Sequence, residues 1–246
     1  MSIRFSASAK TIDHANAILH RLWVQRDQMD ESEKRGLAAI AYTTIASHLE
    51  YVLTCIIELR LDSVEGFTDW NSLAAVPFNS NGHDLNLPVS PLKFTLKKAL
   101  KTERNILGGA AYVKLTESYN RTFKKSFQVV VGDEFVKRLG ALYELRNTFA
   151  HGRKLHFTTM VEKVTTKVDV PDQSPIRTAV EMLRAAGITP QIATPAKAAA
   201  WLDHVYEKDA TLFFYKTVVD AQTKLIAQNE YPAEERRYIS KLPALF

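Results

Sequence analysis

The chain of 246 residues contains one cysteine, Cys55, so neither a disulfide framework within the chain nor a zinc site built on several thiolates can form. Cys55 lies in an apolar stretch, and we expect it to be a small core residue. No uninterrupted apolar run approaches the ~18–20 residues that cross a membrane, and residues 1–10 lack the apolar region of a signal peptide. These absences predict a cytoplasmic protein.

Several common signatures of catalytic sites are also missing. Gly108-Gly109 is not followed by the Gly-Lys-Ser/Thr of a phosphate-binding loop, and no serine stands in a nucleophile-elbow pattern. His14 and His20 are six positions apart, which is not the spacing of two metal ligands on one helix face. We therefore expect no metal site and no cofactor.

The composition is that of an ordinary globular protein. Hydrophobic residues make up 46% and charged residues 24%, so the chain can form a core of one large domain. Lysine and arginine number 32 against 27 acidic residues, which gives a net charge of +5. This basic excess permits binding to nucleic acid or another acidic surface, but it does not require it.

Periodic apolar residues predict a mainly α-helical fold. In 34–61 they recur at helical spacing with no Gly or Pro after Gly36, so we expect a long, deeply packed helix. His48 and Glu50 interrupt this pattern, and we expect them on the more exposed faces, because a buried Glu50 would need a partner. Further helices are expected at 9–29, 92–104, 111–125 and 133–151, with a loop over 62–91.

The region after these helices carries the clearest β signal. Residues 155–170 are rich in Thr and Val that alternate loosely, which predicts one or two strands in a hairpin. A helix should begin at Ser174-Pro175 and end at Gly187, and a long helix should follow at about 195–228. The sequence thus predicts a single domain over 1–246, a helical bundle with a small inserted β-hairpin and helix at about 155–193.

A basic stripe runs along the helix expected at 92–104. It consists of Lys93, Lys97, Lys101 and Arg104, at successive turns of the helix. Two interpretations stay open. The stripe is either a solvated face or a row of contacts to the phosphates of a nucleic acid.

The helix expected at 133–151 carries a charge beside its apolar face. Four apolar residues share one stripe of this helix, namely Phe135, Leu139, Leu142 and Phe149. Arg146 continues the same spacing, so its guanidinium lies on or beside that stripe. A charge there has to be paired, with Glu144 or Glu50 as candidate partners, or has to face a groove open to a polar ligand.

A second stripe of the same helix is polar. It contains Gly140, Glu144, Asn147 and His151, and Gly140 would let another backbone come close. Arg146 and His151 are five residues apart, which separates them by about 140° around the helix at roughly 100° per residue. One helix cannot easily aim both side chains at one small group of atoms, whereas two such helices facing each other could surround a phosphate.

The end of this helix resembles the signature of the HEPN superfamily, an arginine, a polar residue and then a histidine. The matching run is Leu145-Arg146-Asn147-Thr148-Phe149-Ala150-His151-Gly152. The resemblance extends over about 33–152 and the long C-terminal helix, while 155–193 departs from a minimal HEPN domain. It implies a helical bundle and, for catalytic members, cleavage of single-stranded RNA without metal, in a composite site across a homodimer.

The resemblance also implies roles for individual residues. A histidine titrates near neutral pH, so His151 would take the proton of the 2′-hydroxyl. Arg146 would stabilise charge on the phosphoryl oxygens with its bidentate fork. Asn147 would orient His151 or hold a phosphate oxygen, and the products would carry a 2′,3′-cyclic phosphate and a 5′-hydroxyl.

The expected partner is RNA, in a toxin or phage-defence setting with an antitoxin or regulatory protein as a further partner. The residues expected to contact RNA are Lys93, Lys97, Lys101 and Arg153. Two alternatives stay open, a non-catalytic HEPN module for dimerisation and an RNA-binding protein that does not cleave. In the first, His151 caps its own helix and Arg146 pairs with Glu144 or Glu50.

Overall fold

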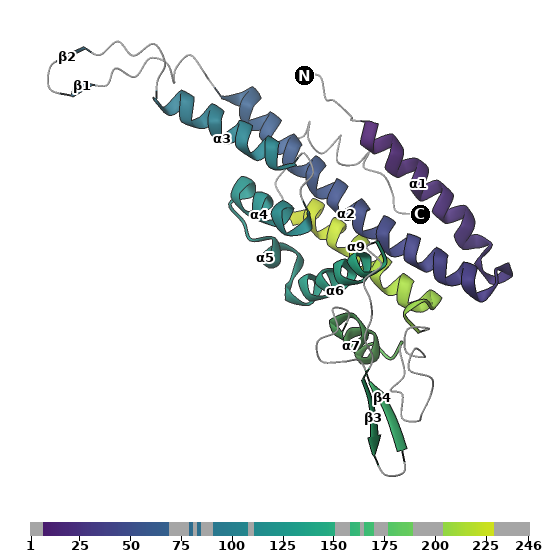
Figure 1. Ribbon diagram of the computed structural model, residues 1–246. Helices are drawn as coiled ribbons and strands as arrows, with labels where there is room; N and C mark the ends of the chain where they lie inside the picture. Colours follow the sequence, from purple (N-terminus) through teal and green to yellow (C-terminus); the bar gives the residue numbers. More distant parts are fainter. Residues whose placement is uncertain are drawn as a thin grey trace.

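The computed structural model of the chain is mainly α-helical (Figure 1). It describes residues 7–68, 79–80, 83–84, 91–107, 111–150, 158–162, 165–169, 177–188 and 204–228.

The central element is the long helix α2 (Glu31–Phe67). The Asp30 side chain accepts a hydrogen bond from the Glu33 N–H at 2.8 Å, and the Glu33 carboxylate accepts one from the Asp30 N–H at 2.9 Å. This capping box satisfies two N–H groups that the first helical turn leaves without partners. It is the reason that the helix begins at Glu31, one turn before the predicted start of 34–61.

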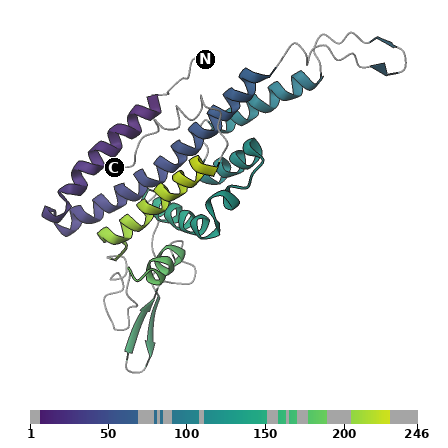
Figure 2. The ribbon, with the colours of Figure 1, turned by 180° about the vertical axis from the view of Figure 1, so that it is seen from behind.

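Helices cover α2 along its length, as Figures 1 and 2 show from opposite sides. Those that pack on it are α1 (Ala7–Val24), α3 (Pro91–Leu107), α4 (Tyr112–Phe123), α6 (Asp133–Ala150) and α9 (Lys208–Gln228). Because neighbours lie on several sides, fully buried residues follow one another closely along α2, among them Tyr42, Ile45, Leu49, Val52 and Ile56. This packing forms the hydrophobic core.

The apolar character of α2 also bears on the expectation of a protein without membrane spans. By length and composition alone, Glu31–Gly66 meets the criteria for a helix that crosses a membrane. However, 61% of the qualifying window is buried inside the protein, and the core helix of a folded domain meets the same criteria. The hydropathy of α2 is thus accounted for by its packing against other helices.

The described part of the chain also contains shorter elements. They are η1 (Arg26–Gln28), α5 (Phe127–Val131), α7 (Arg177–Ala185), β1 (Asn79–Ser80), β2 (His83–Asp84), β3 (Thr158–Glu162) and β4 (Thr165–Asp169). Helix α7 packs on α6. Strands β3 and β4 pair antiparallel, with Thr158 opposite Asp169, within the segment for which the sequence predicts strands.

Strands β1 and β2 also pair antiparallel, inside the segment predicted as a loop. They flank Asn81-Gly82, a dipeptide typical of tight hairpin turns, so the sequence did contain a signal for this pair.

The expected exposure of His48 is wrong, because its side chain is fully buried. The His48 Nε2 lies 3.1 Å from Gln222 Oε1 of α9, and Nδ1 lies 3.5 Å from Asn16 Nδ2 of α1. Helices on both sides of this part of α2 leave no exposed face for the ring. The buried imidazole is instead satisfied by hydrogen-bonding partners, as a polar group in a core has to be.

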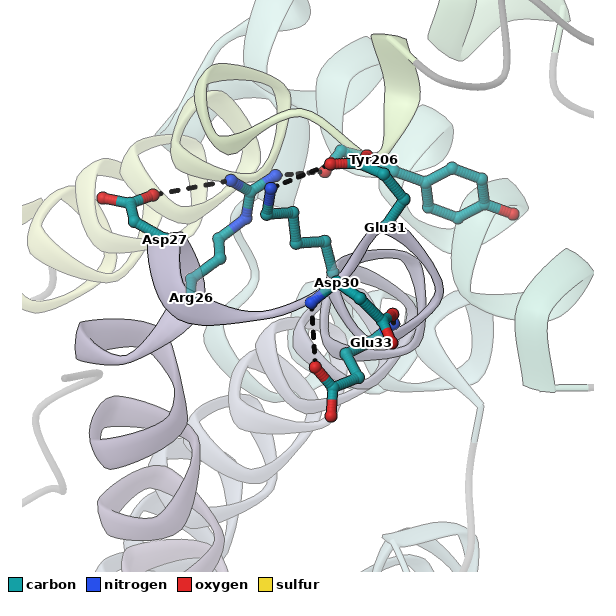
Figure 3. Close-up of polar contacts among 7 residues, drawn as sticks. Arg26, Asp27, Asp30, Glu31, Glu33 and Tyr206 are labelled. Atoms are coloured by element: carbon teal, nitrogen blue, oxygen red, sulfur yellow. Dashed lines mark hydrogen bonds and ion pairs between the residues drawn. The ribbon is translucent and has the colours of Figure 1, made fainter.

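The corner between α1 and α2 is tied to the segment before α9 (Figure 3). The buried Arg26 donates from Nη2 to the carbonyl oxygen of Tyr206 at 3.0 Å, and its Nη1 lies 4.0 Å from Asp27 Oδ1. The Tyr42 hydroxyl donates to the carbonyl oxygen of Val205 at 2.6 Å. Arg26 of η1 and Tyr42 of α2 therefore both bind the segment that precedes α9. Helix α9 then packs against α2.

Candidate functional site

Helix α6 is fixed in rotation by its apolar residues. Leu139, Leu142 and Leu145 are fully buried against the core. Near the C-terminal end, the Phe149 ring stacks on Tyr42 with centroids 5.7 Å apart and also contacts Tyr206, at 5.4 Å. With these side chains packed on the core, the side chain of Arg146 is directed to the boundary between α6 and α2.

Arg146 lies at this boundary with two polar neighbours. Its Nη2 is 3.9 Å from Glu50 Oε2 of α2, and its Nη1 donates a hydrogen bond to Asn147 Oδ1 at 3.2 Å. The side chains of Arg146 and Glu50 are 28% and 19% exposed, so both reach the surface. Of the two partners that the sequence allowed, the structure therefore shows Glu50 beside the guanidinium.

The guanidinium is only partly engaged by these contacts. A separation of 3.9 Å allows charge attraction but is too long for a hydrogen bond, so the contact with Glu50 is electrostatic. The Arg146 Nε is buried and has no hydrogen-bond partner within the described part of the chain. Because a guanidinium carries five N–H donors, Arg146 can still bind an anion that presents two oxygens.

Glu50 is held from a second side by α4. Ala111, the residue before this helix, makes no side-chain cap, and the backbone of Tyr112 hydrogen-bonds to the Glu50 carboxylate instead. Burial raises the pKa of Glu50 above its usual range, while Arg146 and the Tyr112 hydrogen bond lower it by less. A carboxylate from α2 thus supplies the acceptor that the N-terminus of α4 lacks locally.

Two stacked tyrosines lie next to this carboxylate. The rings of Tyr112 and Tyr143 have centroids 4.3 Å apart and are nearly parallel, and the Tyr143 hydroxyl donates to the Ala46 carbonyl oxygen at 3.0 Å. Burial raises the pKa of both phenols, so they stay neutral at physiological pH. Tyr143 lies one turn before Arg146 and could have been found from that spacing, whereas no signal in the sequence pointed to Tyr112.

The structure shows a contact of Asn147 beside those predicted. Its Oδ1 accepts from the Arg146 guanidinium, which helps to hold Arg146 and leaves the Nδ2 group as the donor that would hold a phosphate oxygen. Glu144, one turn earlier, is half-buried, and its carbonyl oxygen accepts a hydrogen bond from the Thr148 hydroxyl at 2.8 Å. Gly140 is exposed, and a Cβ built there would have no atom of the described residues within 4 Å, so the described part of the chain does not cover this part of α6.

The other predicted residues are described only in part. His151 and Arg153 lie outside the described residues, as does the side chain of Lys93 in α3. Lys97 and Lys101 are exposed on α3. Arg104, the last member of the basic stripe, forms ion pairs with Asp62 at 2.7 Å and Glu65 at 2.5 Å, so it joins α3 to the end of α2.

No metal ligand set is present in the part of the chain that the structure describes, since no three His, Cys, Asp or Glu side chains are grouped there to hold an ion.

The comparisons with known proteins give no relative, so an assignment of function has to rest on this geometry. Nothing matches the chain among family models, among curated proteins or among solved structures.

Proposed function

We propose that this protein is a metal-independent endoribonuclease of HEPN type, a HEPN-like bundle with a small β-hairpin and helix inserted after α6. The observation that carries the proposal is the state of Arg146. It lies half-buried at the end of α6, donates to Asn147, and faces Glu50 across 3.9 Å without a hydrogen bond. An arginine held in this way keeps donors for a phosphate, which it binds through two parallel hydrogen bonds.

In the proposed reaction, a 2′-hydroxyl of single-stranded RNA attacks the adjacent phosphorus. His151 accepts the hydroxyl proton, the 5′-oxygen leaves and takes up a proton, and the strand ends in a 2′,3′-cyclic phosphate and a 5′-hydroxyl. Arg146 stabilises the negative charge that develops on the phosphoryl oxygens. Asn147 positions Arg146 through the hydrogen bond between their side chains.

The proposed active form is a homodimer. Five residues separate Arg146 from His151, a spacing of about 140° on an ideal helix, so a second copy would supply the complementary groups. Among the described residues, the surface around Gly140 has room for another backbone, because a Cβ there would have none of them within 4 Å. This openness favours α6 as the contact between the two copies.

The proposed substrate is RNA in the cytoplasm, in a toxin or phage-defence role with an antitoxin or regulatory protein as a further partner. Exposed Lys97 and Lys101 of α3 would contact phosphates, together with Lys93 and Arg153. The direct test is cleavage of end-labelled RNA in excess EDTA by the wild type and by Arg146→Ala and His151→Ala. Arg21→Ala serves as the control, because Arg21 is an exposed arginine on α1.

We expect the wild type and Arg21→Ala to cut and to leave cyclic-phosphate ends, and both site variants to lose at least 100-fold in rate, roughly the contribution of one charge-stabilising or proton-transfer group. Equal cutting by His151→Ala would refute this site.

A second candidate follows from the same ion pair. If Arg146 only joins α6 to α2 through Glu50, the protein would be a non-catalytic HEPN dimerisation module or an RNA-binding regulator. RNA binding without product, by both wild type and Arg146→Ala, would favour this second function.

A further inference from the structure

The Glu50 carboxylate lies beside the guanidinium to which a phosphate would bind. Its carboxylate lies 3.9 Å from the Arg146 guanidinium and also accepts a hydrogen bond from the backbone of Tyr112. The exposed fractions of 19% for Glu50 and 28% for Arg146 leave both open to a ligand at the surface. A phosphate that approaches the Arg146 donors therefore comes close to a carboxylate.

We infer that Glu50 is the resident counter-ion of Arg146, that a phosphate of bound RNA displaces it from the guanidinium, and that Glu50 takes up a proton from solvent in this exchange. The inference rests on the proposed function, because it takes Arg146 as a phosphate ligand. It adds a regulatory property of that site: RNA binding is linked to one proton at a residue of α2.

The physical reason is the charge balance around the carboxylate. Within the described residues, Arg146 of α6 is the charged group that acts on Glu50, and the neighbouring ionisable side chains are Tyr112 of α4 and Tyr143 of α6. A phenol is neutral or negative and never positive, and burial raises the pKa of both tyrosines, so they add neither a positive nor a negative charge beside Glu50. When a phosphate takes the guanidinium and adds its own negative charge, ionised Glu50 is half-buried beside an anion, and protonation relieves the repulsion.

The contact geometry favours exchange over a permanent structural pair. A buried structural pair is held by hydrogen bonds between the charged groups, whereas Arg146 and Glu50 lie beyond hydrogen-bonding distance. Arg146 also keeps its contact with Asn147, so its position does not depend on Glu50 alone. A protonated carboxyl group still has acceptor capacity, so a neutral Glu50 can keep its hydrogen bond with the backbone of Tyr112.

The test is calorimetric titration of the protein with an oligoribonucleotide of ten 2′-O-methyl residues, which lacks the attacking hydroxyl and cannot be cleaved. Titrations at mildly acidic pH in buffers of different ionisation enthalpy measure the protons taken up per bound strand. The variants are Glu50→Gln, which keeps an acceptor for the Tyr112 backbone, and Glu58→Gln as the matched control. Glu58 is also on α2, and partial desolvation and the nearby Asp62 raise its pKa, but it is exposed and lies about 12 Å along the helix at 1.5 Å per residue.

We expect the wild type and Glu58→Gln to take up a fraction of a proton that Glu50→Gln does not. The wild-type Kd should fall with decreasing pH by up to about tenfold per pH unit for one linked proton, and this dependence should be weaker in Glu50→Gln. Equal proton uptake by wild type and Glu50→Gln would overturn the inference and leave the proposed ribonuclease intact.

Two further outcomes separate this inference from the proposed function. If Arg146→Ala binds the strand as tightly as the wild type, Arg146 is not a phosphate ligand, and both proposals fail. If proton uptake on strand binding depends on Glu50 but natural RNA is not cut, only the proposed ribonuclease activity fails. Should Glu50→Gln not fold, infrared difference spectra of the wild type decide: a new protonated-carboxyl band on strand addition supports the exchange, and its absence overturns it.

Discussion

At the residue scale, Arg146 and Glu50 each offset the unfavourable free energy of partly burying the charge of the other. Ionised Glu50 is destabilised by burial, and Arg146 is the positive charge that offsets this effect. Removing one partner of such a pair leaves a desolvated charge without its counter-ion, whereas removing both leaves no uncompensated charge. The pair therefore has a measurable signature in stability, separate from any activity.

We expect Arg146→Ala to lower the free energy of unfolding by about 1–2 kcal/mol at pH 7, and the Glu50→Gln/Arg146→Ala double variant to recover part of this loss. Without Arg146 the folded-state pKa of Glu50 rises further above its unfolded value. The penalty is then present at neutral pH and disappears as the pH falls below about 4.3, the ordinary pKa of glutamate. Urea unfolding at pH 7 and near pH 4.5 measures it, and an equal loss at both would contradict this account.

At the scale of elements, a buried polar contact joins three helices. His48 of α2 lies between Asn16 of α1 and Gln222 of α9, with its side chain fully buried. The contact gives the helices a specific register that apolar packing alone would not require, because each polar atom in the core needs its partner.

His48→Ala should therefore destabilise the fold by about 2–4 kcal/mol, the combined effect of a cavity and of polar groups left without partners. His14→Ala on α1, where the side chain is exposed, should change the stability by less than about 0.5 kcal/mol. Thermal and urea unfolding of the two variants make the comparison. Equal small effects would mean that the core relaxes around the missing ring.

The open part of α6 offers a second prediction for an element. Gly140→Arg should leave the folded chain intact, because a Cβ at Gly140 has no neighbour within 4 Å in the part of the chain that the structure describes, and helix propensity favours the change by about 0.5–1 kcal/mol. If two copies meet through this face, the variant should sediment as a monomer and should lose RNA cleavage.

Gly36→Arg is the matched control, since Gly36 of α2 is exposed and equally open. Sedimentation velocity distinguishes the two variants. A dimer of unchanged affinity in Gly140→Arg would exclude the face around Gly140 as the contact between copies.

At the scale of the whole molecule, the net charge does not say which basic residues are open to a ligand. Arg104 and Arg121 of neighbouring helices are engaged by carboxylates, Arg104 by Asp62 and Glu65 and Arg121 by Glu103. These contacts connect α2, α3 and α4. The net charge of +5 is therefore a poor guide to an RNA-binding surface, and individual exposed lysines have to be tested.

Replacing Lys97 and Lys101 together by alanine should weaken RNA binding and should flatten its dependence on salt. For single strands the slope of log K against log salt changes by about 0.7 for each phosphate contact removed, so a change of about 1.4 is expected. Lys208→Ala at the start of α9 is the control for an exposed lysine elsewhere. Binding constants measured from 50 to 200 mM salt test this prediction. An unaltered slope of log K against log salt would rule out Lys97 and Lys101 as phosphate contacts.

The sequence by itself determined the helical character of the chain, because 3.6-residue periodicity records which face of each helix is buried. It also determined that Arg146 needs a partner, since its position beside an apolar stripe follows from spacing within one helix. The tertiary structure alone decided that the partner beside Arg146 is Glu50, that Tyr112 adjoins it, and that His48 is buried. Each of these facts depends on how distant helices pack around α2, and local spacing carries no information about which helix lies across a contact.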